Sequence, residues 1–125
     1  MDFAVEVKDK YAVIRVNAEK LNSAVAPGLK SQLVVSNSEG VKNLIMEMSC
    51  TRYCDSSGLS AILVANRLCK NAGGCLVLAG LQDPVMKLIN ISQLDGVLNI
   101  VPTVDEAVDF IFMEEVEKDV NDTDE

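Results

Sequence analysis

Two short apolar runs with one apolar helix between them constrain the fold of this 125-residue chain more than any other feature. Residues 44–48 and 75–79 are short and apolar, which suits central strands covered on both faces. The apolar spacing of residues 59–68 predicts a helix that ends at Gly73-Gly74. A strand, a helix and a strand in this order form a βαβ unit, so we expect parallel strands joined by a right-handed crossover.

The residues before this unit predict a hairpin followed by a helix. Residues 3–7 carry large apolar side chains at alternate positions, and residues 11–16 follow as a second strand after a charged turn. Leucine and valine then recur every four residues behind Asn22 and Ser23, which are both good N-cap residues. The helix they start is expected to end near Gly40.

The residues after the unit predict a short helix, an edge strand and a last helix. Asp83 and a following proline are interpreted as an N-cap and a first-turn residue. Residues 98–101 suit an edge strand, and Thr103 with Glu106 matches a capping box before an amphipathic helix. The chain is therefore expected to be one α/β domain, with a mixed sheet of four to five strands and about four helices.

The negative charge of the chain is concentrated at its end. Residues 114–125 hold seven acids and one lysine, whereas residues 1–113 hold twelve acids and ten bases. We therefore expect a domain over residues 1–113 and a disordered acidic tail over residues 114–125. A chain with no basic stripe is not expected to bind nucleic acid.

The sequence also disfavours membrane insertion, export and several kinds of chemistry. No apolar run approaches the ~18 residues of a membrane span, and the start of the chain lacks a signal peptide, so a cytoplasmic location is expected. The absence of histidine excludes Ser-His-Asp and Cys-His nucleophiles. The four cysteines lack the spacing of a zinc site, and no nucleotide-binding glycine motif is present. We expect no catalytic residue, no metal and no cofactor, and we interpret Met46, Met48, Met86 and Met113 as packing residues.

The segment Asp55-Ser56-Ser57-Gly58 is the most informative for function, because it joins a buried strand to a helix. Ligands of open α/β sheets bind at such junctions. A helix N-terminus has free N–H groups and the positive end of the dipole, so a phosphate on Ser56 would be compatible with the fold. Gly58 allows another backbone to come close. Helix capping by Asp55 and Ser56 alone is the competing interpretation, and the local pattern does not decide between the two.

Over about residues 3–112 the sequence resembles the STAS domain family, which includes the bacterial anti-sigma factor antagonists. The most specific likeness is Asp55-Ser56-Ser57-Gly58-Leu59 after the strand at residues 44–48. Residues 19–22 ahead of the helix at residues 26–30 are similar to a second segment of the family. Asn22 stands where the family usually has Asp, and Tyr53-Cys54 replaces a more common apolar pair. The resemblance implies the STAS fold, a mixed sheet with helices.

The resemblance also implies a function. In the family, the serine that corresponds to Ser56 is phosphorylated by a partner that is both an anti-sigma factor and a serine kinase. The dephosphorylated antagonist binds this partner, and a PP2C-type phosphatase restores it. By resemblance, Ser56 is the phosphorylation site, and the partner-binding residues are Asn22, Ser23, Tyr53, Asp55, Ser56, Ser57 and Gly58. A monomer or a weak dimer is expected.

Two alternatives remain open at the level of the sequence. The first is a ligand-sensing or scaffold STAS module of a larger signalling assembly, which would use the same junction without being phosphorylated. The second is an enzyme, which the poor inventory of acid and base groups disfavours.

Overall fold

The computed structural model describes residues 2–123. The elements in chain order are β1 (Phe3–Val7), β2 (Ala12–Val16), β3 (Lys20–Leu21), α1 (Ala26–Ser38), β4 (Leu44–Glu47), β5 (Tyr53–Cys54), α2 (Ser56–Asn71), β6 (Leu76–Ala79), α3 (Asp83–Ile91), β7 (Asn99–Val101) and α4 (Val104–Thr123). Five strands form a sheet in the order β1-β2-β4-β6-β7, and β3 pairs with β5 outside it. The expected α/β fold with a mixed five-stranded sheet and four helices is confirmed.

The strand directions follow from the connections. β1 and β2 are antiparallel, as expected of a hairpin, whereas β2, β4, β6 and β7 are mutually parallel. The predicted βαβ unit is β4-α2-β6, with Leu44 aligned with Leu76 across the two strands. Parallel strands place their carboxyl ends at one edge of the sheet, so the loop that leads from β4 to α2 lies at that edge.

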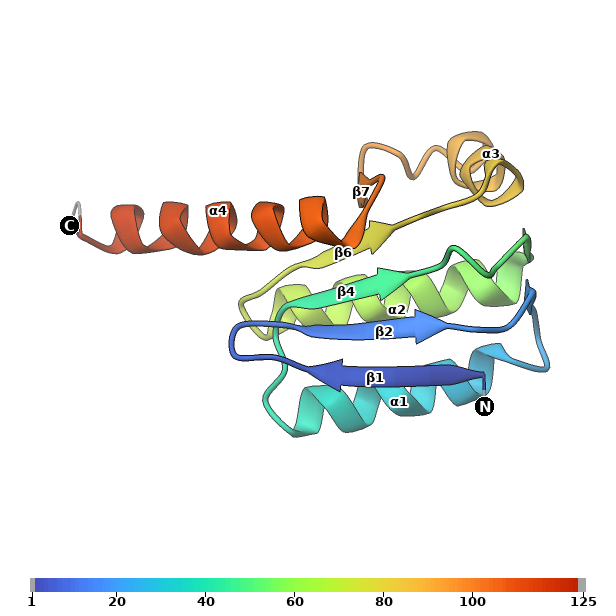
Figure 1. Ribbon diagram of the computed structural model, residues 1–125, viewed down its shortest axis with the longest axis horizontal. Helices are drawn as coiled ribbons and strands as arrows, with labels where there is room; N and C mark the ends of the chain where they lie inside the picture. Colours follow the sequence, from blue (N-terminus) through green and yellow to red (C-terminus); the bar gives the residue numbers. More distant parts are fainter. Residues whose placement is uncertain (1, 124–125) are drawn as a thin grey trace.

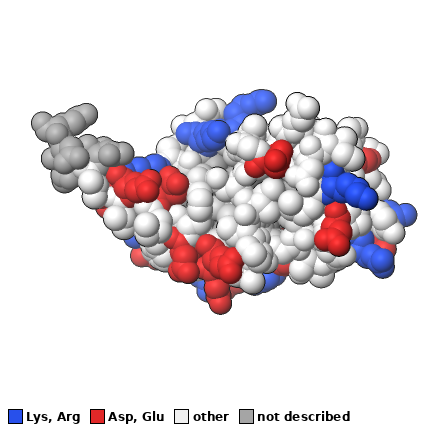
Figure 2. All heavy atoms as spheres, turned by 90° about the horizontal axis from the view of Figure 1, so that it is seen from above, with Lys and Arg blue, Asp and Glu red and all other residues white. Residues whose placement is uncertain are grey.

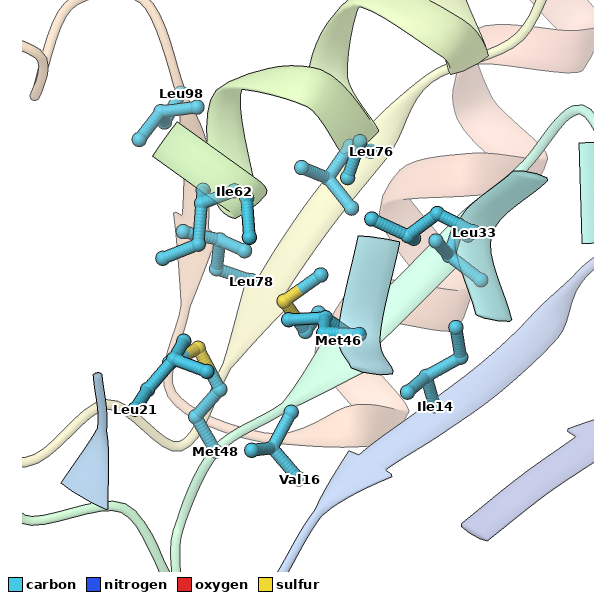
Figure 3. Packing of buried hydrophobic residues seen from close by; sticks show 14 of the residues in the cluster. Ile14, Val16, Leu21, Leu33, Met46, Met48, Ile62, Leu76, Leu78 and Leu98 are labelled. Atoms are coloured by element: carbon cyan, nitrogen blue, oxygen red, sulfur yellow. The ribbon is translucent and has the colours of Figure 1, made fainter. Parts of the chain in front are cut away.

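Alternate residues of the central strands point to opposite faces of the sheet, and each face has its own core. On one face, Ile14, Met46 and Leu78 pack with buried residues of α1 and α2 (Figure 3). On the other face, Val13, Ile45 and Val77 pack with Ala107 and Ile111 of α4. Figure 1 shows α1 and α2 together on one side of the sheet. The two layers explain why every residue of β4 and β6 is buried.

The starts of three helices test the predicted caps. Thr103 caps α4 as predicted, because its Oγ1 accepts from the Glu106 N–H at 3.2 Å. The predicted cap at Asp83 is wrong: Asp83 is the first helical residue, and the N-cap Gln82 makes no side-chain cap bond. The predicted caps at Asn22 and Ser23 are also wrong, because α1 begins later, behind Val25.

The acidic end of the chain differs from the expectation. α4 continues to Thr123, so the disordered tail predicted from residue 114 onward is wrong for residues 114–123. Asp124 and Glu125 lie outside the described residues. Composition suggested disorder, but part of the helix is held to the rest of the fold by contacts that composition does not reveal. Over residues 2–123, no helix has both the length and the apolar character needed to cross a bilayer.

Candidate functional site

The candidate site is the start of α2, where a single side chain caps the helix. Asp55 is the N-cap, and its Oδ1 accepts the Gly58 N–H at 3.0 Å. Ser56 and Ser57 follow as the first helical residues, whose backbone N–H groups have no acceptor within the helix. Among the residues that the structure describes, nothing bonds to the exposed Ser56 hydroxyl. Capping therefore accounts for Asp55 but not for Ser56.

A two-residue strand pair holds this junction in place. Lys20 and Leu21 of β3 run parallel to Tyr53 and Cys54 of β5. The Leu21 carbonyl accepts the Asp55 N–H at 3.2 Å, which fixes the backbone just before the cap. The pair lies outside the main sheet and brings the residues after β3 next to the start of α2.

Gly58 is required by the close approach of β3 to α2. A Cβ atom at this position would lie 2.3 Å from the Leu21 carbonyl oxygen and 2.7 Å from the Cys54 sulfur. No side chain fits at such distances, so the backbone contact expected at Gly58 is present. Burial, and secondarily Asp55, raises the pKa of the neighbouring Cys54 thiol to about 11.

The turn after β3 forms the second wall of the site. The Asn22 Oδ1 accepts the Ala24 N–H at 3.0 Å, and the Asn22 carbonyl accepts the N–H groups of Val25 and Ala26. Asn22 thus stabilises a tight turn that leads into α1, instead of capping the helix itself. The turn places the exposed Ser23 on the side of α1 that faces α2.

An open hollow of about 430 Å³ separates the two helices at this edge. Its lining residues come from both sides and are Ser23, Ala26, Pro27, Lys30, Ser56, Ser57 and Ser60. Three of the predicted site residues, Ser23, Ser56 and Ser57, therefore come together. The sequence-based prediction missed Lys30, although its spacing of four residues from Ala26 puts the two on the same face of α1.

The other predicted site residues lie around the hollow without lining it. Asn22, Asp55 and Gly58 support the backbone, as described above. Tyr53 is 48% exposed, and the Arg52 guanidinium lies 6.0 Å from the centre of its ring. An exposed aromatic ring stacked by an arginine is the kind of group that is enriched at protein interfaces. Within residues 2–123 no cluster of three or more acidic, cysteine or histidine residues could hold a metal ion.

The model of the STAS domain matches residues 2–107 of the chain. The chain belongs to the STAS domain family. A curated relative, the anti-sigma-B factor antagonist of Bacillus subtilis (strain 168), is 30% identical over 101 residues, which cover 80% of this chain and 92% of the relative. The family assignment made from the residues around Ser56 is thereby confirmed.

Solved structures of STAS proteins agree with the fold. An anti-sigma factor antagonist from Mycobacterium paratuberculosis is 18% identical, with a TM-score of 0.78 over 87% of this chain and 92% of that chain. The Bacillus cell fate determinant SpoIIAA in its phosphorylated form is 22% identical, with a TM-score of 0.68 over 87% of this chain and 98% of that chain. Identities this low support the shared architecture alone.

Proposed function

We propose that this STAS domain is an anti-sigma factor antagonist, a module that docks onto an anti-sigma factor and is controlled by a phosphate on Ser56. The observation that carries the proposal is the Ser56 hydroxyl, which is exposed at the first position of α2 and bonded to nothing among the described residues. The name of the Bacillus subtilis relative supports the class of partner, and favours docking over the ligand-sensing alternative.

The chemistry of the hollow suits a switch that acts by charge. A phosphoserine carries about −1.5 to −2 charges at neutral pH, so it would add repulsion and desolvation cost to a partner surface placed over the hollow. A loss of only about 1.4 kcal/mol lowers affinity tenfold. Lys30 lines the same hollow, and an ammonium group is a common partner of phosphate. The fold itself need not change, since phosphate is compatible with a helix N-terminus.

The finer part of the proposal concerns the enzymes that set the switch. The anti-sigma factor itself would act as the serine kinase, and a PP2C-type phosphatase would remove the phosphate. The test is to incubate the protein with its anti-sigma factor and ATP and to locate the phosphate by mass spectrometry. Ser56→Ala should abolish labelling, whereas Ser57→Ala and Ser60→Ala, two changes in the same hollow, should leave it at Ser56.

Partner affinity gives the second test. Ser56→Asp should weaken binding to the anti-sigma factor by at least about tenfold relative to the unphosphorylated native chain. The matched control is Ser38→Asp, which adds the same charge on an exposed serine at the far end of α1. Label on another residue, or equal affinities for the two aspartate variants, would refute the role of Ser56.

A further inference from the structure

The second half of α4 carries a line of exposed apolar side chains that the proposed function does not use. Phe112, Met113, Val116 and Val120 are 45%, 61%, 55% and 53% exposed. Spacings of one, three and four residues place them on one side of a helix, and we call this set the α4 stripe. The interpretation of Met113 as a packing residue is therefore wrong. Contiguous apolar surface on a helix marks an interaction site more often than an isolated apolar residue does.

The opposite side of α4 holds this half of the helix to the protein. The Asn43 Nδ2 donates to the Glu115 carboxylate at 2.7 Å, and the Lys42 ammonium lies 3.7 Å from the same carboxylate. The Lys118 ammonium donates to the Gly73 carbonyl. These polar contacts hold the helix in place, and none of them involves a residue of the stripe.

The stripe also lies beyond the apolar core beneath α4. The buried residues that α4 contributes to this core are Ala107 and Ile111, both before the stripe. Phe112 meets the ring of Tyr11 edge-on at 6.4 Å, and it still keeps nearly half of its surface exposed. Phe112, Met113 and Val116 are thus held on the helix with 45% or more of each side chain exposed.

The charge around the stripe selects the kind of partner. Apart from Glu115 and Lys118 on the opposite side of the helix, residues 112–120 contain three acids and no base. Figure 2 shows acidic side chains beside uncharged ones along the end of the molecule that α4 forms. A second copy of this chain would bring like charges together, which opposes pairing of two stripes. An apolar strip bordered by lysine or arginine would instead meet both the apolar and the charged groups of α4.

We propose that the α4 stripe binds a basic amphipathic helix of another protein, whose apolar residues recur at i, i+3, i+4 and i+7 and are bordered by lysine or arginine. The surface is separate from the Ser56 hollow. Asn43 and Gly73, which hold α4, lie at the amino ends of β4 and β6, whereas Ser56 follows the carboxyl end of β4 (Figure 1). The inference therefore does not depend on the phosphorylation switch.

The probe for the test is a labelled three-heptad helical peptide with leucine at a and d and lysine at e and g. Its binding to the full chain is measured by fluorescence anisotropy. Val116→Asp should raise its Kd by at least about tenfold, although the added negative charge alone would lower it. The matched control is Val34→Asp on α1, where the valine is 57% exposed, and this change should not weaken binding.

Two further measurements complete the test. Glu117→Lys should weaken binding of the lysine peptide and should improve binding of a version with glutamate at e and g. Circular dichroism checks that each variant keeps its fold. A lysine peptide that does not bind, or that binds Val116→Asp as tightly as the native chain, would overturn the proposal. Sedimentation that shows a dimer abolished by Val116→Asp would also overturn it, because the occupant would then be a second copy.

Discussion

Asn43 and Ser56 lie at opposite ends of β4, and they use their polar atoms in opposite ways. Asn43 is 2% exposed, and its side chain makes three hydrogen bonds: its Nδ2 donates to the Lys10 carbonyl at 3.1 Å and to Glu115 at 2.7 Å, and its Oδ1 accepts the Cys75 N–H at 3.0 Å. Ser56 is exposed, and among the described residues its hydroxyl bonds to none.

The two ends of β4 have different roles: the amino end stabilises the fold, and the carboxyl end leads to the candidate site. Asn43 joins the β1–β2 turn, β6 and α4, so its bonds hold the fold at the amino ends of the strands. At the carboxyl end, the groups that hold the fold are Asp55 and Gly58, and Ser56 between them is left to solvent. A polar group with no partner inside the protein can be modified or covered at little cost to stability. Variants at both ends of β4 test this difference.

The largest effect is expected at Gly74, beside Asn43. A Cβ there would lie 2.0 Å from the Lys42 carbonyl oxygen and 2.7 Å from the Asn43 Oδ1, so the backbone would have to move. Gly74→Ala should lower the free energy of unfolding by about 3 kcal/mol, measured by urea denaturation. Gly96→Ala is the control, because a Cβ at Gly96 has no heavy atom within 4 Å. Equal stability of the two variants would show that the amino end is not tightly packed.

Asn43→Ala is expected to have the next largest effect. The change leaves the Cys75 N–H and the Lys10 carbonyl, both in part-buried hydrogen bonds, without their side-chain partner, which should cost about 2–3 kcal/mol in the free energy of unfolding. Asn90→Ala, an exposed position on α3, is the matched control and should change stability by less than about 0.5 kcal/mol. A similarly small loss for Asn43→Ala would contradict its structural role.

The parts of this fold that the sequence predicts are those with long, regular patterns. The apolar runs of β4 and β6 and the spacing of α2 contain enough residues to show their period, and their parallel pairing follows from one connection rule. β3 and β5 have two residues each, which is too short for any period. Their pairing depends on contacts between residues about thirty positions apart, which are not visible locally.

The candidate site shows the same limit. The junction at Ser56 can be predicted from the sequence, because a strand, a capping residue and a helix follow one another there. Lys30 joins it only through the packing of α1 against α2, so its place in the hollow needed the structure. The sequence does not reveal that the end of α4 is helical, because its acidic composition is typical of disorder. The hydrogen bond that holds Glu115 comes from Asn43, which is far away in the sequence.

A smaller effect is expected at the carboxyl end, where two adjacent residues can be compared. Asp55→Ala removes the side-chain cap of α2 and should cost about 1 kcal/mol in the free energy of unfolding. Ser56→Ala should cost less than about 0.5 kcal/mol, because the hydroxyl bonds to no described group. Thermal unfolding of both variants measures the difference. Equal losses would revive capping as the role of Ser56.

The smallest expected effect is a pH dependence of stability that comes from Glu115, the residue bound by Asn43 at the amino end of β4. The hydrogen bond from Asn43, and then the charge of Lys42, lowers the pKa of the Glu115 carboxyl below its ordinary 4.5. Folding therefore favours the ionised form, so its contribution to stability is fully present above pH 4.5 and is lost as the pH falls through the folded pKa.

The measurement is the stability difference between the native chain and Glu115→Gln, followed by urea denaturation from neutral to acidic pH. The difference should be largest at neutral pH and should shrink below pH 4.5, because the native carboxyl then becomes neutral like the amide. Glu117→Gln, an exposed position on the same helix, is the control for a general loss of negative charge. A difference for Glu115→Gln that stays constant with pH would mean that the bond from Asn43 does not depend on the charge. Packing and neutral hydrogen bonds alone would then stabilise the amino end of β4. Asn43 and Ser56 would differ in burial but not in electrostatic interactions.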